Sequence, residues 1–162
     1  MAEGQKPVLR ILRSVLLSLY SSRTPPRILL KPPVEVTAHT SLQILTPIQY
    51  VDTFLGKKLT VEVKYTAVIY LKEMGSDERF RVMEVTTTFM HIIEPGEELK
   101  AIIDTPPDNL PREIVEQLVA ATIHKTIPIL VTLFEKHMVP IALPFKIEVK
   151  IETSSAKRKE DN

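Results

Sequence analysis

The chain has no cysteine and no tryptophan, and its 162 residues include only four glycines against thirteen prolines. Without cysteine there can be no disulfide, thiolate nucleophile or cysteine-ligated metal, and we expect a cytoplasmic protein. The four glycines are isolated, so the sequence contains no glycine-rich phosphate-binding loop. A formal net charge of only +1 argues against binding nucleic acid through bulk charge.

Catalytic patterns are also missing. The histidines His39, His91, His124 and His137 show no metal-ligand spacing, and no nucleophile lies beside a recognisable general base. We therefore predict that the protein is not an enzyme and uses no cofactor or metal. No uninterrupted apolar stretch approaches the roughly 20 residues of a membrane span.

Strand patterns are plentiful. Apolar and polar residues alternate in four segments, as expected for strands with one buried face. These segments span residues 33–45, 58–72, 79–93 and 145–152. The short polar connection between the second and third segments predicts an antiparallel hairpin, whereas residues 46–58, with Pro47 and Gly56, predict a loop.

Two segments have helical periodicity instead. In residues 7–20, the positions Leu9, Leu12, Leu16 and Leu19 recur at helical spacing, which predicts a basic amphipathic helix. From residue 112 to 138 the apolar residues again follow a helical period, and these predict a long helix. Its interior proline, Pro128, should kink it. Residues 94–116 hold seven acids, two bases and four prolines, and most of this stretch is predicted to form an irregular acidic loop.

Grouped strands followed by a long helix indicate an α+β fold. We predict a four-stranded antiparallel sheet packed against a long Pro-kinked helix, with an extra N-terminal amphipathic helix. Residues 1–32 would hold that helix and a Pro-rich linker, residues 33–152 the main domain, and residues 153–162 a polar disordered tail.

The long helix is apolar on nearly every face, since only Pro128 and Thr132 between Ile127 and Phe134 are not plainly hydrophobic. A single sheet covers one helix face, so the other face, the N-terminal helix and the apolar residues of the acidic loop are left over. Excess apolar surface indicates oligomerisation or the binding of apolar partners.

The connection from this helix to the last strand is specific. Fifteen residues separate Pro128 from Pro144, and "ALPFKIEV" at 142–149 enters the strand. This spacing resembles that of the SecB-like chaperone family, in which a Pro-containing helix leads through a second Pro into the last strand. The stretch "RFRVMEVTTTFMHIIEPGEE", residues 79–98, is similar to the family's corresponding strand and turn. The order of elements agrees over residues 33–151, whereas the N-terminal helix and the lack of a second helix after the last strand depart from the family pattern.

The resemblance implies an ATP-independent holdase, a chaperone that binds unfolded polypeptides in apolar grooves and assembles as a homotetramer, a dimer of dimers. For such a holdase we predict that clients bind to the leftover apolar residues beside the long helix, which are Leu12, Leu16, Ile92, Ile93, Leu99, Ile102, Ile103 and Leu110. The residues that the resemblance implies at the oligomer interface are Ile123, Ile127, Val131, Phe134 and Met138. Glu84 alone matches the acidic positions with which the family docks on a translocase motor.

Two other functions fit the same residues. A structural or adaptor oligomer would use its apolar surface in a fixed assembly or on one dedicated protein partner. A membrane-peripheral protein would lie on an anionic surface through residues 7–20, although the thin charged stripe of that segment favours docking onto the protein itself.

Overall fold

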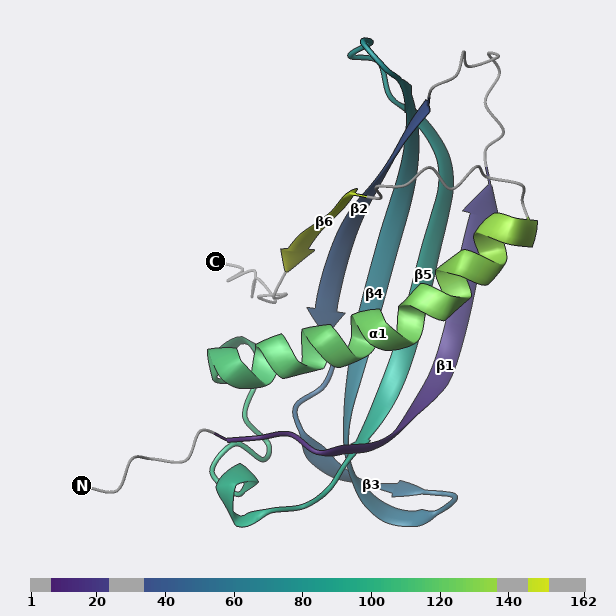
Figure 1. The fold of residues 1–162 in the computed structure, drawn as a ribbon. Helices are drawn as coiled ribbons and strands as arrows, with labels where there is room; N and C mark the ends of the chain where they lie inside the picture. The colour runs from purple at the N-terminus through teal and green to yellow at the C-terminus, as the bar shows by residue number, and fades with distance from the viewer. Residues whose placement is uncertain (1–6, 24–33, 137–145, 152–162) are drawn as a thin grey trace, which may run out of the picture.

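A twisted sheet crossed on one face by a single helix forms the fold (Figure 1). The computed structural model describes residues 7–23, 34–136 and 146–151. Its strands are β1 (Ile11–Arg23), β2 (Val34–Ile44), β3 (Gln49–Thr53), β4 (Gly56–Glu73), β5 (Phe80–Ile93) and β6 (Lys146–Ile151). Before the helix α1 (Arg112–Lys136) lie two short 3-10 helices, η1 (Glu97–Leu99) and η2 (Pro107–Asn109).

The strands are ordered β1-β5-β4-β2-β6, and β3 pairs with the beginning of β4. Strands β1 to β5 pair antiparallel. The predicted α+β class is confirmed, and so are the three central strands. The sheet is larger than the predicted four strands, because β1 joins it at one edge and residues 46–58, predicted as a loop, contribute β3.

The last strand departs from the prediction in direction, because β6 runs parallel to β2 rather than antiparallel. Two antiparallel steps, from β5 to β4 and from β4 to β2, make β5 and β2 run in the same direction. The connection from β5 through α1 to β6 therefore joins strands of equal direction. A long helical crossover can make such a connection, whereas a tight turn cannot.

The predicted N-terminal helix is wrong, because residues 11–23 form β1, paired antiparallel with β5 along its whole length. Two register irregularities explain why the sequence resembles a helix. The register skips between Ile11 and Arg13 and again between Leu16 and Ser18, so Leu12 and Leu17 lack a direct partner. Each extra residue lengthens the spacing of same-face side chains from two to three, which imitates a helical spacing.

The core lies between α1 and the facing side of β2, β4 and β5. Alternate residues of β4 from Leu59 to Leu71 are all buried, which confirms the predicted alternation. From the helix, Ile114, Leu118 and Leu130 reach this core. The helix continues through Pro128, and its axis changes direction along its length in Figure 1, as expected for an interior proline.

Candidate functional site: the exposed apolar surface of β1 and α1

Strand β1 forms one edge of the sheet, and among the described residues no strand pairs with its outer side. Five large apolar side chains of this strand are more than two-fifths exposed: Leu12, Leu16, Leu17, Leu19 and Tyr20. Its charged side chains are Arg13 and Arg23 only. Apart from its two register irregularities, an edge strand of thirteen residues with so little charge has little protection against pairing with another chain.

Helix α1 adds two exposed apolar side chains, Ile127 at 42% and Val131 at 40%. The register brings β1 close to this part of the helix. Leu19 lies opposite Thr87 of β5, and the Thr87 hydroxyl lies 3.3 Å from that of Thr126, the residue before Ile127. Paired residues of antiparallel strands share a face of the sheet, so Leu19 is on the helix side. Tyr20 lies opposite Thr86 and therefore points to the other face of the sheet. The exposed leucines of β1, together with Ile127 and Val131 of α1, are named here the β1–α1 surface and form our candidate site.

The residues predicted for client binding divide into two groups. Leu12 and Leu16 are exposed on β1, where an extended chain could reach them. Ile92 is buried outside the core cluster. The remaining predicted contacts are buried or partly buried against the core: Ile93, Leu99, Ile102, Ile103 and Leu110. Residues 94–111 do not form an open apolar groove in this arrangement, because they close over the end of the core. A backbone hydrogen bond of 2.9 Å from Asp104 to Ile48 helps to hold them there.

Two of the predicted oligomer contacts lie on the outward side of α1. Ile127 and Val131 are exposed, and Ile123 is partly buried against the core. The side chain of Phe134 and all of Met138 lie outside the described residues. Glu84, the predicted docking residue, forms an ion pair with Arg81, which neutralises much of the charge that a translocase motor would meet.

A row of polar side chains joins α1 to the sheet. The two ring nitrogens of the fully buried His91 lie 2.8 Å from the hydroxyls of Ser14 and Thr122, respectively. Thr122 donates its own proton to the Leu118 carbonyl at 2.8 Å, so its oxygen accepts from His91 Nε2–H. His91 Nδ1 then accepts the proton of the Ser14 hydroxyl. The network thus assigns the tautomer of the imidazole and satisfies both of its nitrogens.

A serine that donates to a histidine is also the start of a nucleophilic triad, but this one lacks the groups that catalysis needs. Burial, and to a lesser extent the charge of Lys125, lowers the pKa of His91 to about 4. A base this weak removes a serine proton poorly, and Thr122 has no negative charge to stabilise an imidazolium. The Ser14–His91–Thr122 chain therefore positions α1 on the sheet. Within the described residues there is also no cluster of three or more possible metal ligands.

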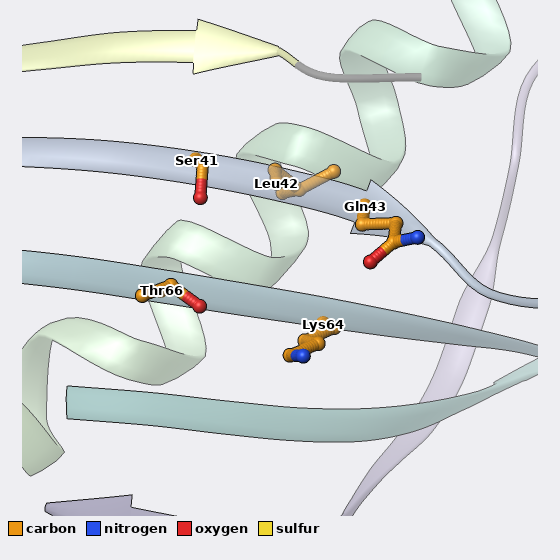
Figure 2. Close-up of a pocket in the computed structure, with 5 residues that line it drawn as sticks. All are labelled: Ser41, Leu42, Gln43, Lys64 and Thr66. Carbon is orange, nitrogen blue, oxygen red and sulfur yellow. The ribbon is translucent and has the colours of Figure 1, made fainter. Parts of the chain in front are cut away.

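The sheet face away from α1 carries a polar depression of about 200 Å³ (Figure 2). Ser41, Gln43, Lys64 and Thr66 line it with two hydroxyls, an amide and one ammonium group, while Leu42 turns its side chain to the core. These groups can hydrogen-bond to a polar molecule. They provide no nucleophile with an adjacent base, so this depression does not suggest a reaction.

No family model, no curated protein and no solved structure matches this chain. The resemblance to the SecB-like family therefore stays a prediction. By length and composition, the segment Arg112–Leu133 of α1 could cross a membrane, although the sequence had shown no such segment. Only 28% of the most apolar part of that segment is buried, and the buried side chains Ile114, Leu118 and Leu130 belong to the core against the sheet.

Proposed function

We propose that this protein is an ATP-independent holdase, similar in kind to the SecB-like chaperones, that binds extended segments of unfolded polypeptides. The observation that supports this proposal is the β1–α1 surface, an apolar edge strand beside exposed apolar side chains of the helix. Nothing on this surface performs chemistry. It offers apolar contacts and free backbone groups, the two features that an unfolded chain of any sequence can use.

Backbone pairing explains how such a surface would accept many sequences. The outer edge of β1 presents N–H and C=O groups that any extended segment can pair with. Side chains such as Leu16 and Leu19 then gain roughly 25 cal/mol for each Å² of apolar area that the client covers. Main-chain hydrogen bonds contribute affinity independently of sequence, so specificity stays broad.

A holdase of this kind should suppress the aggregation of a chemically unfolded client. We expect light scattering from the diluted client to fall when the protein is in molar excess. The double variant Leu12→Lys/Leu17→Lys should lose most of this protection, because charges on an edge strand oppose strand addition. Both residues are exposed and lack a direct partner on β5, so the variant should keep its fold.

A matched control adds the same two charges elsewhere. Leu45 and Met74 are exposed apolar residues outside β1 and α1. The double variant Leu45→Lys/Met74→Lys should therefore protect the client as well as the unmodified protein does. Unchanged scattering with the unmodified protein in excess would contradict the proposal. If both variants lose protection of the client equally, the activity does not depend on β1.

Oligomerisation gives a second test, since the family resemblance implies a tetramer. Four chains of 18.4 kDa give a native mass of about 74 kDa by light scattering. The variant Ile127→Glu/Val131→Glu should lower this mass, because it places charges on exposed apolar positions of α1 that would be desolvated in the interface. In such an assembly the α1 part of the β1–α1 surface is covered by another subunit, and the β1 part stays open to clients. A monomeric mass for the unmodified protein would contradict the assembly.

The adaptor alternative shares this fold and would cover the β1–α1 surface permanently. A hydrophobic dye separates the two functions, because a holdase keeps apolar surface accessible after assembly and a closed oligomer does not. We expect strong dye binding to the assembled protein. Its reduction in Leu12→Lys/Leu17→Lys would locate the accessible surface on β1.

A further inference from the structure

A second apolar feature lies at the tip of the hairpin that joins β3 to β4. Phe54 is 81% exposed, the largest exposed fraction among the large hydrophobic residues of the described part of the chain, and its neighbour Leu55 is 45% exposed. These two residues form the turn between Thr53 and Gly56, which pair with each other. This hairpin tip is far along the sequence from β1 and α1, and the proposed holdase function does not use it.

Turn chemistry does not explain a Phe-Leu pair at this position. Tight hairpin turns favour glycine, asparagine and aspartate, which adopt positive φ or hydrogen-bond to the local backbone. Here neighbouring residues fulfil those roles. Gly56 has φ of 92°, and the Thr53 hydroxyl donates to the Gly56 carbonyl at 2.7 Å and accepts from the Leu55 amide at 3.1 Å. The turn is thus locked locally, and Phe54 and Leu55 are free to serve another purpose.

Each face of the hairpin base carries one partly exposed apolar side chain next to a lysine, with Tyr50 beside Lys57 and Val51 opposite Lys58. Tyr50 and Val51 are consecutive in β3, so they point to opposite sides of the ribbon, and they are 46% and 37% exposed. A protein pocket usually receives one face of a ribbon. The interface of a lipid layer can surround both faces at the level of the headgroups while only the tip enters deeper.

The charges behind the tip match an anionic surface. Lys57 and Lys58 follow the turn directly, and the ammonium group of Lys57 lies 5.9 Å from the centre of the Tyr50 ring. Aromatic rings next to lysines are typical of residues at the level of lipid headgroups. Asp52 is the only acid within residues 49–59, so this stretch has a formal net charge of +1.

The negative charges of the acidic loop do not cancel the attraction of the hairpin tip to an anionic surface. It attaches through the hydrogen bond from Asp104 to the Ile48 carbonyl, just before β3. The five residues of β3 extend about 17 Å at 3.3 Å per residue. That length is about two Debye lengths at physiological ionic strength, so charges at the attachment point are largely screened at the tip.

We propose that the β3–β4 hairpin tip docks reversibly on an anionic membrane surface, with Phe54 and Leu55 in the boundary between headgroups and acyl chains. Lys57 and Lys58 then lie among the lipid phosphates. The attachment is weak for one chain, because only two apolar side chains insert, and several chains in one assembly would strengthen it. A holdase held in this way would meet client chains at the membrane surface.

The absence of tryptophan provides a direct reporter. The variant Phe54→Trp carries the chain's single tryptophan at the tip, and the tryptophan emission should shift to the blue on adding phosphatidylcholine vesicles that contain phosphatidylglycerol. Met74→Trp places the reporter on another exposed apolar residue, in the turn between β4 and β5, and its emission should not shift. Equal shifts in both variants, or none in Phe54→Trp, would overturn the proposal.

Vesicle co-sedimentation separates the roles of the side chains. Phe54→Ser/Leu55→Ser should lower the binding constant about tenfold or more, and Leu45→Ser/Met74→Ser should leave it unchanged. Lys57→Gln/Lys58→Gln should weaken binding about tenfold on anionic vesicles at low salt and should not alter binding to phosphatidylcholine alone. If the tip variant loses client protection while vesicle binding is unchanged, the hairpin contacts polypeptides instead, and the membrane proposal is wrong. If the β1 variant Leu12→Lys/Leu17→Lys loses client protection but still binds vesicles, the hairpin proposal is not affected.

Discussion

Replacing Leu118 by alanine is expected to lower the free energy of unfolding by about 2–5 kcal/mol, one of the two largest effects of a single change that we predict. Leu118 is fully buried and belongs to the core between α1 and the sheet. Its truncation removes apolar contacts and leaves a cavity that the surrounding strands close only in part. The helix depends on few such residues, since threonines occupy other positions that face the sheet.

Chemical denaturation at neutral pH measures this effect, with Met74→Ala as the control. Met74 is 68% exposed in the turn after β4, so its truncation should change the free energy of unfolding by less than about 0.5 kcal/mol. A small effect of Leu118→Ala would mean that α1 does not pack on the sheet in the way described here.

Acidification is expected to destabilise the fold by about 3 kcal/mol through His91 alone. The pKa of His91 is lowered from 6.5 to about 4, first by burial and second by the charge of Lys125. Between these two pH values the unfolded chain binds a proton that the folded protein does not bind. Stability therefore falls as pH drops below 6.5, by at most about 1.4 kcal/mol per pH unit, and the contribution of His91 levels off below pH 4.

Unfolding curves at several pH values between 7 and 4 test this linkage. The variant His91→Gln has no titrating group at this position, so it should not lose this stability on acidification. The difference in the free energy of unfolding between the unmodified protein and this variant should therefore shrink by about 3 kcal/mol as the pH falls from 7 to 4. In Lys125→Gln the pKa of His91 should rise toward 6.5, and the loss of stability should become smaller. Parallel pH profiles for all three proteins would show that His91 is not buried as a neutral imidazole.

Much of the fold could be predicted from the sequence because its signals are local. The alternation of β4 and the helical period from Arg112 each report a single buried face, and both elements are present as expected. Strand β1 could not be predicted in this way. Its two irregularities at Leu12 and Leu17 give a spacing typical of a helix, and the residues that determine its structure are those of β5, far along the chain.

The direction of β6 and the position of β3 were missed for related reasons. Alternation indicates that a segment is a strand but carries no information about the direction of its neighbour, which depends on where α1 ends. The β3–β4 hairpin has Phe54 and Leu55 where glycine or asparagine would have signalled a tight turn.

The candidate site could be predicted only in part. Surplus apolar surface was evident from composition, and Leu12, Leu16, Ile127 and Val131 are indeed exposed. Apolar residues of the acidic loop, such as Leu99, could not be distinguished from client-binding residues, because burial depends on how the loop folds over the core. The hydroxyl partners of His91 could not be predicted from the sequence, because Ser14 and Thr122 lie in segments far from His91 along the chain.

The pairing of β1 with β5 has a consequence for synthesis on the ribosome. Ile11 pairs with Ile93, about 80 residues later in the chain. At about 5–20 residues per second, the leucine-rich segment of β1 waits roughly 4–16 s before its partner strand has been made. Strands β2 and β4 can pair during that time, whereas β1 is the earliest of the described strands to emerge and one of the last that can dock. A newly made chain thus exposes the same kind of apolar segment that the finished protein is proposed to shield in others.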